Sequence, residues 1–346
     1  MGCGQTADIE LIAEGLILDS GDHEVDTLRA RPVASRRNLA GLRENGGDAP
    51  PLLFPEGAED VALIEKAFDE RVDVRLVEGG KPKCLELAEL LKNDGRIRSR
   101  VLVDRDFDHL AGTPALNNTL VITTRAHDVL MDVLLAAPRI LLAVIKGANK
   151  KRYRDLTAEE QSADIDTILD GVYGAVFNLA CVRIFNAQSE VGLKFDNFSF
   201  SNYIAGGEVT IERAVDLVLL KSRDLDGLMV DTTAGVVEKG EDLIDVTSGV
   251  GAVATELRRN DLTLMGDHDF LSALNHHLDG SWGSEKLRTL LEAQAERAEI
   301  LSSHWGHQVT DFVRNVPQLS SDLADLMDEI ESSAVSDGAV KSETGD

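Results

Sequence analysis

Short apolar runs alternate with amphipathic stretches along the first half of the chain. Four segments have the apolar or alternating pattern of β-strands: residues 52–54, 72–77, 100–103 and 119–123. Three segments have apolar positions at helical spacing: residues 60–68, 82–91 and 129–145, the last expected to be one long helix. Strands that alternate with helices are typical of a parallel, doubly wound sheet, whose functional loops lie at the carboxyl ends of the strands. The pattern therefore predicts an α/β fold.

The second half of the chain has a different pattern, in which helical spacing dominates. This half is expected to be mainly helical, with segments near residues 157–186, 208–224, 252–278 and 284–314. The stretch Gly46-Gly47-Asp48-Ala49-Pro50-Pro51 has the composition of a linker. We predict four parts: an N-terminal leader or cap (1–48), an α/β catalytic domain (49–150), a helical domain (151–316) and an acidic tail (317–346). The tail is expected to be disordered, because it is acidic and loses apolar content after Ser332.

Composition indicates a globular protein of a reducing compartment. With 346 residues and 43% hydrophobic content, the chain can fill a sizeable core. No stretch approaches 18 uninterrupted apolar residues, and the N-terminus lacks a basic region followed by an apolar one, so we expect a cytoplasmic location. Cys3, Cys84 and Cys181 are too scattered for a disulfide framework or a CxxC zinc site.

The net charge of -26 restricts the kinds of partner that the chain can bind unaided. Long-range repulsion from phosphate slows the encounter with nucleic acid, so a nucleic-acid enzyme of this charge needs a local basic surface or a partner. The alternative is that the charge is an adaptation of the host to salt or solubility.

The sharpest chemical signal is an acidic turn that directly follows a predicted strand. Val101-Leu102-Val103 runs into Asp104-Arg105-Asp106-Phe107-Asp108. Alternate residues of an extended chain face the same way, so the carboxylates of Asp104, Asp106 and Asp108 are expected to converge. Converging carboxylates repel one another unless a cation neutralises them, and Mg²⁺ or Mn²⁺ prefers oxygen ligands. The turn therefore predicts a divalent-metal site, where a metal would lower the pKa of a bound water and clamp a phosphodiester.

The acidic turn also allows other interpretations, each of which requires a motif of its own. The turn can be a surface loop with solvated aspartates, or the DxD motif of a nucleotide-sugar transferase. An EF-hand does not fit, because His109 and Ala115 stand where that loop needs glycine and glutamate. A haloacid-dehalogenase-type phosphatase fits poorly, because Asp108 stands where that family has threonine or valine.

A second acidic pair follows the first predicted strand. Glu56-Gly57 comes directly after Leu52-Leu53-Phe54-Pro55, and Asp60 lies four residues beyond Glu56. The glycine permits a tight strand-to-helix turn, and a residue four positions on returns to the same side of the first helical turn. Glu56 and Asp60 can then face one metal ion. The alternative is that both acids only stabilise the N-terminus of the following helix.

The order of these segments resembles the Toprim domain shared by topoisomerases, primases and OLD-type nucleases. The common order is an acid-glycine turn, then alternating strands and helices, then an apolar strand ending in DxD. Four segments resemble the OLD-type branch in particular, which includes the Toprim effector nucleases of PARIS anti-phage systems: FPEGAED (54–60), GGK (79–81), VDRDFD (103–108) and VITTRAHD (121–128). GLKFD (192–196) and GDHDFL (266–271) resemble weaker markers, so the resemblance covers roughly residues 50–280.

The resemblance implies a role for each acid. Glu56 would be the general acid/base and a metal residue, Asp60 an accessory ligand, and Asp104 and Asp106 metal ligands. Two departures from the family pattern are present. Pro55 replaces the usual β-branched residue before the glutamate. The family's further acid after the fourth strand can be Asp128 or Asp132, which bears on a second metal.

Basic residues are the candidates for holding the backbone of a substrate. Gly79-Gly80-Lys81 opens a predicted helix, where free N–H groups and the lysine can bind a phosphate, although it is not a Walker A loop. Residues 146–154 contain five basic residues and Tyr153. The alternatives are an exposed lysine after a glycine turn and the ordinary preference of cations for a helix C-terminus. The nucleic-acid-binding candidates are Lys81, Lys83, Lys146, Lys150, Lys151, Arg152 and Arg154, and Lys81 is also a catalytic candidate.

The resemblance and the acidic residues together lead to one functional expectation. The chain is expected to be a Mg²⁺- or Mn²⁺-dependent Toprim nuclease that hydrolyses phosphodiester bonds in RNA, such as tRNA, or in DNA. The resemblance further implies an effector of anti-phage defence, controlled by an ABC/AAA-type ATPase partner and active as a homodimer. The alternatives are a non-catalytic, Toprim-derived binding or regulatory module and, with less support, a DxD nucleotide-sugar transferase.

Overall fold

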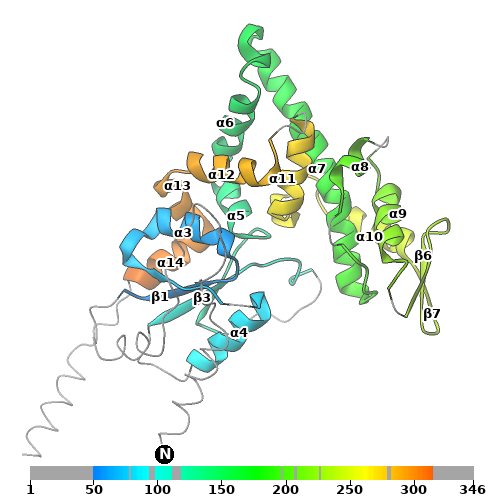
Figure 1. Cartoon of the computed structure of the whole chain (residues 1–346), viewed down its shortest axis with the longest axis horizontal. Coiled ribbons are helices and arrows are strands. Elements are labelled where there is room, and N and C mark those ends of the chain that lie inside the picture. The colour runs from blue at the N-terminus through cyan, green and yellow to red at the C-terminus, as the bar shows by residue number, and fades with distance from the viewer. Residues whose placement is uncertain are drawn as a thin grey trace, which may run out of the picture.

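A computed structural model of the chain describes residues 50–77, 79–92, 98–110, 118–195, 198–205, 209–225, 227–278 and 282–314. The predicted leader over residues 1–48 and the predicted acidic tail over residues 317–346 lie outside the described residues. The described part has a triangular outline in Figure 1, with a parallel sheet near one corner and a helical hairpin at the apex.

The predicted parallel sheet is present. It contains four strands: β1 (Leu52–Pro55), β2 (Asp73–Val74), β3 (Ser99–Val103) and β4 (Val121–Thr123). Their order is β2-β1-β3-β4 and every neighbouring pair is parallel, with Leu53 opposite Arg100 and Val101 opposite Val121. Strand β2 is shorter than the predicted run over residues 72–77. The prediction of an α/β fold with a parallel sheet is confirmed.

Helices cover both faces of this sheet, which explains the unbroken apolar runs over residues 52–54 and 101–103. Because side chains alternate along a strand, Phe54 and Val101 face α4 (Gly80–Leu91), whereas Leu53 and Leu102 face the opposite side. On that opposite side lie η1 (Ala58–Asp60), α3 (Val61–Phe68) and η2 (Asp69–Arg71). The helices predicted over residues 60–68 and 82–91 are confirmed.

The single helix predicted over residues 129–145 is wrong. The segment forms two helices, α5 (Val129–Ala136) and α6 (Arg139–Ala148). Pro138 lacks a backbone N–H and disfavours helical geometry at the residue before it, and Ala137 has φ -136°. The φ of Pro138, -61°, then suits the start of α6.

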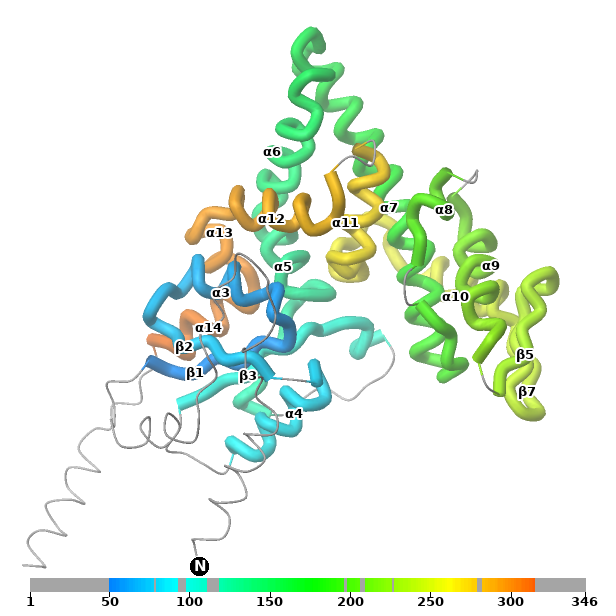
Figure 2. The backbone as a smooth tube through the Cα atoms, in the orientation of Figure 1, coloured from blue at the N-terminus to red at the C-terminus, as the bar shows by residue number. Residues whose placement is uncertain are grey.

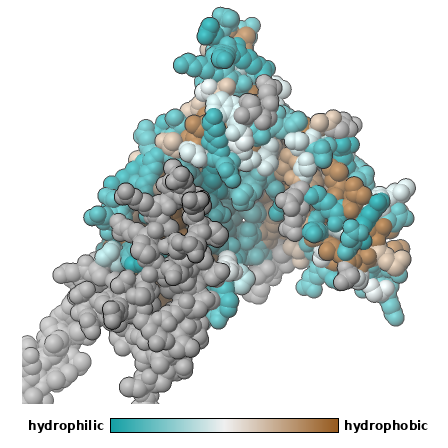
Figure 3. All heavy atoms as spheres, in the orientation of Figure 1, coloured by the Kyte–Doolittle hydropathy of each residue, from teal (hydrophilic) through white to brown (hydrophobic). Residues whose placement is uncertain are grey.

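The second half is mainly helical, as predicted. Its helical elements are η3 (Arg152–Asp155), α7 (Ala158–Ser189), α8 (Phe200–Ala205), α9 (Ile211–Ser222), α10 (Val246–Glu256), η4 (Leu262–Leu264), α11 (Asp267–His277), α12 (Ser284–Gln294), α13 (Arg297–Ser302) and α14 (His304–Arg314). An unpredicted antiparallel sheet lies between α9 and α10, with strands β5 (Leu228–Asp231), β6 (Val236–Lys239) and β7 (Asp242–Asp245). Met229 and Leu243 of this sheet are exposed, and brown, apolar surface is visible over this side of the molecule in Figure 3.

The C-terminal helices return to the first sheet, as the tube in Figure 2 shows. Helix α13 packs on α3 and α5, and α14 packs on α5 and β4. Trp305 is fully buried 6.3 Å from the Phe68 ring and donates its indole N–H to the carbonyl oxygen of Val129 at 3.2 Å. Arg98, just before β3, donates to the carbonyl oxygens of Phe312 and Val313 at the end of α14. The predicted domain boundaries at residues 150 and 316 remain predictions. Segments on both sides of residue 150 share one hydrophobic core.

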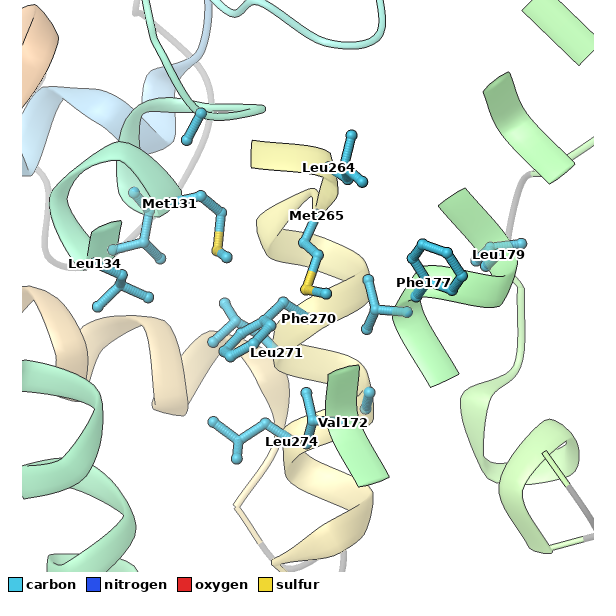
Figure 4. Close-up of a cluster of buried hydrophobic side chains, with 14 of the residues drawn as sticks. Met131, Leu134, Val172, Phe177, Leu179, Leu264, Met265, Phe270, Leu271 and Leu274 are labelled. Atoms are coloured by element: carbon cyan, nitrogen blue, oxygen red, sulfur yellow. The ribbon is translucent and has the colours of Figure 1, made fainter. Parts of the chain in front are cut away.

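Helix α11 links the two halves of that core. Figure 4 shows Phe270, Leu271 and Leu274 of α11 between Met131 of α5 and Val172 of α7. Tyr173 of α7 lies 6.2 Å from the Phe270 ring. The apolar side chains of α11 therefore fix the position of its N-terminus, where Asp267 lies, relative to α5.

Helix α7 is, among the described residues, the one helix long and apolar enough to cross a membrane. Two-thirds of its most apolar window, 67%, is buried inside the fold. A core helix of a water-exposed protein has the same properties, so this is weak evidence for a membrane span.

Candidate active site

Chain segments that follow parallel strands meet at one edge of the first sheet. Glu56 follows β1, Asp104 follows β3, and Asp128 lies five residues beyond β4. Glu56 Oε2 accepts a hydrogen bond from the Asp104 N–H at 3.1 Å, which joins the two predicted acidic segments directly. We call Glu56, Asp60, Asp104, Asp106, Asp108 and Asp128 the acidic edge.

Glu56 lies half-buried against the start of α4. Gly79 and Gly80 have φ values of +100° and +62°, which glycine adopts at little cost, and a Cβ on Gly80 would lie 3.9 Å from Glu56 Oε1. Burial raises the pKa of Glu56, the backbone amides of Asp104 and Lys81 oppose that rise, and the Asp106 charge adds to it. Glu56 is therefore a carboxylate that holds a proton more readily than an exposed glutamate.

Asp104 has a buried carboxylate oxygen, Oδ1, to which no group among the described residues donates a hydrogen bond. Burial is the main cause that raises its pKa to about 10, and the charges of Asp60, Asp128, Glu56 and Asp106 add to it. A carboxylate in such surroundings keeps its negative charge only if a cation is near. This oxygen is the feature of the acidic edge that best fits a bound metal.

Lys81 reaches from α4 into the acidic edge. Its Nζ donates to the Asp104 carbonyl oxygen at 2.5 Å and to Asp106 Oδ2 at 2.8 Å, and it lies 2.7 Å from Asp108 Oδ2. Burial lowers the pKa of Lys81, but the bonds to both aspartates raise it further, so the ammonium stays charged. Lys81 therefore neutralises two of the predicted metal ligands.

Asp60 is buried, with 3% of its surface exposed, and is paired with an arginine that the sequence interpretation missed. Arg288 Nη2 lies 3.4 Å from Asp60 Oδ1, while Nη1 of the same side chain donates to Asp267. Burial raises the pKa of Asp60 well above its ordinary value, and the Arg288 charge opposes the rise. Arg288 and Asp267 come from α12 and α11, more than 200 residues along the chain from Asp60, so only tertiary packing brings them together.

The additional acidic residue expected after the fourth strand has two candidates, Asp128 and Asp132, which have different surroundings. Asp128 caps α5, because its Oδ1 accepts from the Met131 N–H at 2.9 Å and its Oδ2 accepts from the Asp267 N–H at 2.7 Å. Its charge also acts on Asp104 and Asp60. Asp132 instead accepts from the N–H groups of Ala126 and Trp305, at 3.2 and 3.1 Å. Both aspartates therefore anchor backbone amides, and Asp128 is the one whose charge reaches Asp104 and Asp60.

His127 is a further polar residue at the edge, to which the sequence interpretation gave no role. Its Nδ1 lies 3.5 Å from Asp128 Oδ2 and its Nε2 lies 3.9 Å from Asp106 Oδ1. Burial lowers the pKa of His127, but the two carboxylates outweigh it and raise the pKa overall. The ring packs edge-on to Phe107, with centroids 4.7 Å apart. His127 therefore lies between Asp106 and Asp128 at the acidic edge.

The acidic edge lacks a preformed set of metal ligands. Among the described residues, no group of three or more histidine, cysteine, aspartate or glutamate side chains is arranged to hold one metal ion. Lys81 and Arg288 hold three of the predicted ligands as ion pairs. The residues that fit a metal best are Asp104, through its unpartnered Oδ1, and Glu56, which lies beside it.

The predicted basic residues lie in two places. Lys81 is at the acidic edge, and Lys83 on the same helix pairs with Glu86 at 2.6 Å. Lys146, Lys150, Lys151, Arg152 and Arg154 are exposed around η3, at the tip of the α6–α7 hairpin. Figures 1 and 2 show this basic tip at the apex, away from the sheet. Arg152 pairs with Asp164 there.

No protein-family model, curated protein or solved structure matches this chain.

Proposed function

We propose that the chain is a Toprim-like, metal-dependent hydrolase that cleaves phosphodiester bonds at the acidic edge. The observation that carries the proposal is the buried, unpartnered Oδ1 of Asp104 among four other carboxylates. Buried charges of one sign are costly, and Mg²⁺ or Mn²⁺ is the class of cation that oxygen-rich sites prefer. The parallel sheet order and the positions of Glu56 and Asp104 after adjacent strands also support a Toprim-like arrangement.

Each residue has a proposed task. Asp104 and Glu56 would hold the metal, with Asp106, Asp108, Asp60 and Asp128 as further candidates. When bound, the metal would activate a water and stabilise charge on the phosphate. Glu56 would accept the proton of the attacking water, because burial raises its pKa and makes it a better proton acceptor than an exposed glutamate. Lys81 would neutralise negative charge that develops on the scissile phosphate.

The proposed substrate and partners follow from the resemblance to OLD-type Toprim nucleases and from the distribution of charge. RNA, such as tRNA, or DNA is the proposed substrate, and the basic tip is the proposed second contact for its backbone. A homodimer and an ABC/AAA-type ATPase partner in anti-phage defence follow from the resemblance, and the cytoplasmic location expected from the sequence pattern stays a prediction. A partner would also offset the repulsion expected from a net charge of -26.

The ion pairs of Lys81 and Arg288 favour one competing function. Cations of the chain itself already neutralise Asp60, Asp106 and Asp108, which is what a metal-free binding or regulatory module would need. Such a module would bind nucleic acid or a protein without cutting it. The unpartnered oxygen of Asp104 is the observation against this alternative.

The proposal is tested by incubating the chain with a mixed panel of tRNA, other RNA and DNA. Cleavage is expected with Mg²⁺ or Mn²⁺ and not with EDTA. Asp104→Asn is expected to lower the rate by at least about a hundredfold, because it removes a metal ligand at nearly constant volume. Asp216→Asn, at an exposed aspartate on α9, is the matched control and should cleave normally. An Asp104→Asn variant that cleaves like wild type would show that the edge is not the active site.

A further inference from the structure

Helix α6 has one face that the other described residues leave uncovered. Exposed residues recur along it at positions 139, 142, 143, 146 and 147, which is the spacing of one side of a helix. Leu142 is 38% exposed there. A Cβ added to Gly147 would meet none of the described residues outside its own turn of helix within 4 Å. This face therefore offers apolar surface and room for another segment to approach closely.

Cations follow the face toward the basic tip. Arg139 at its start is already paired with two glutamates, and Arg152 at the tip is paired with Asp164. Glu159 and Glu160, the nearby acids, lie in the first turn of α7, where they interact with the helix dipole. The cations that pair with no carboxylate among the described residues are exposed: Lys146, Lys150, Lys151 and Arg154. Their charge is available to an anionic partner.

The C-terminal tail has the complementary pattern in its sequence. Leu323, Leu326, Met327 and Ile330 recur at the spacing of one helix face, and five acids are interleaved with them over residues 322–331. A segment with an apolar stripe and flanking acids can order when it binds a surface of matching pattern. The open face of α6, with its apolar centre and its lysines, has that pattern.

A second exposed apolar surface of the described fold does not suit the tail. Met229, Glu238 and Leu243 lie side by side across β5, β6 and β7, with Met229 68% and Leu243 72% exposed. Asp231 and Asp242 are exposed on the same sheet. An acidic segment is repelled by these carboxylates, whereas the lysines of α6 attract it. Charge therefore selects the face of α6.

The tail is long enough to reach this face. The path from Arg314 back along α14, and then along α5 and α6 to Lys146, covers 11, 8 and 8 residues, or about 41 Å at 1.5 Å per residue. Residues 315–331 span about 56 Å when extended at 3.3 Å per residue. With residues 322–331 in a helix, they still span about 41 Å. The acids beyond Leu323 can therefore lie beside Lys146 and the tip.

We propose that the acidic tail docks along the exposed face of α6 and pairs with the lysines of the basic tip. Its apolar stripe covers Leu142, and its acids neutralise Lys146, Lys150 and Lys151. A docked tail competes with the phosphate backbone of nucleic acid for the same lysines. That competition rests on the proposed function, whereas the docking does not.

Carbodiimide cross-linking of the full chain, followed by peptide mass spectrometry, tests the docking. The reagent joins a lysine to a contacting carboxylate as an amide, with loss of water and no spacer. Links are expected between the three lysines of the face and tip and the acids of residues 322–346. They should disappear in about 1 M salt, where the Debye length falls to about 3 Å. Lys239, exposed on the acidic sheet, is the internal control and should give no link to the tail.

A variant of the tail tests the apolar part of the contact and leaves the packed core untouched. Leu326→Asp/Met327→Asp is expected to lower the yield of tip–tail links at least about fivefold, because it removes the apolar stripe while every lysine and acid remains. Val335→Asp/Val340→Asp adds the same charge outside the stripe and is the matched control. Its yield should equal that of wild type.

A mixture of ¹⁵N-labelled and unlabelled chains identifies the copy that supplies the tail. Links within one chain that depend on the stripe support the proposal. The proposal is overturned by the absence of tip–tail links, by links only between labelled and unlabelled chains, or by links that Leu326→Asp/Met327→Asp leaves unchanged.

Binding of nucleic acid tests the competition separately. Leu326→Asp/Met327→Asp should bind a 20-base-pair duplex in EDTA at least about threefold more tightly than wild type, because more of the chains have a free tip. If the tail docks and the duplex affinity does not change, the tip is not a nucleic-acid contact and the docking stands. A chain that docks its tail and cuts nothing in the nucleic-acid panel loses only the nuclease function.

Discussion

At the residue scale, Asp104 decides how the acidic edge responds to protons and metal. Its pKa of about 10 in the folded chain lies far above the ordinary value of 3.8, so the folded state holds a proton that the unfolded state releases. The contribution of Asp104 to stability is therefore fully present below about pH 4 and is lost as the pH rises toward 10. A bound divalent cation would replace that proton and cancel the loss.

The raised pKa of Asp104 predicts that the metal-free protein loses stability as the pH rises. Between pH 5 and pH 9 in EDTA, the unfolding free energy of wild type is expected to fall by at least about 1.4 kcal/mol more than that of Asp104→Asn, the equivalent of one pKa unit. Chemical denaturation of wild type and variant at several pH values measures it. Parallel pH profiles for the two proteins would contradict the raised pKa of Asp104.

At the element scale, some features follow from local pattern and others from tertiary packing. The strands that carry Glu56 and Asp104 were predictable, because their apolar runs are buried on both faces. The break between α5 and α6 was missed because apolar spacing continues across Pro138. Strands β5 and β7 were missed because each has only four residues and none of them is buried.

The same distinction applies to the candidate site. Glu56 and Asp104 could be placed together from sequence, because parallel strands end at one edge of a sheet. Asp267 and Arg288 could not be placed beside Asp60 from sequence, because their approach to it depends on how α11 and α12 pack over the core. The segment GDHDFL was noticed only as a family marker, and its first aspartate proves to lie beside Asp128.

Helix α14 should be essential to the sheet that carries the site. Trp305→Ala is expected to lower the unfolding free energy by about 3–5 kcal/mol, because it leaves a cavity beside Phe68 and breaks the bond to Val129. Trp282→Ala, at a half-buried tryptophan under Lys286, should cost less than half as much. Urea denaturation compares them, and equal losses would argue against this role of α14.

At the scale of the whole molecule, the basic tip and the acidic edge stand at opposite ends of α5 and α6. Helices of eight and ten residues separate them, which together span at most about 27 Å at 1.5 Å per residue. A nucleic acid that contacts both must therefore span several base pairs. The overall charge of -26 makes this local basic surface the more important for binding.

Charge reversal at the tip should weaken binding of long substrates more than short ones. The double variant Lys150→Glu/Lys151→Glu is expected to lose at least about tenfold in affinity for a 20-base-pair duplex, with a shallower salt dependence. Lys92→Glu, at an exposed lysine at the end of α4, is the control. Fluorescence anisotropy in EDTA measures binding without cleavage. Equal affinity for the duplex in both variants would rule out the tip as a contact.

The central claim is that Asp104 and Glu56 form a divalent-metal site. Anomalous scattering from a crystal soaked in Mn²⁺ tests it most directly, because it locates the metal without reference to activity. A peak within about 2.5 Å of Asp104 Oδ1 is the expected result, given the usual metal–oxygen distances. A fully soaked crystal with no anomalous peak at the acidic edge would contradict the claim.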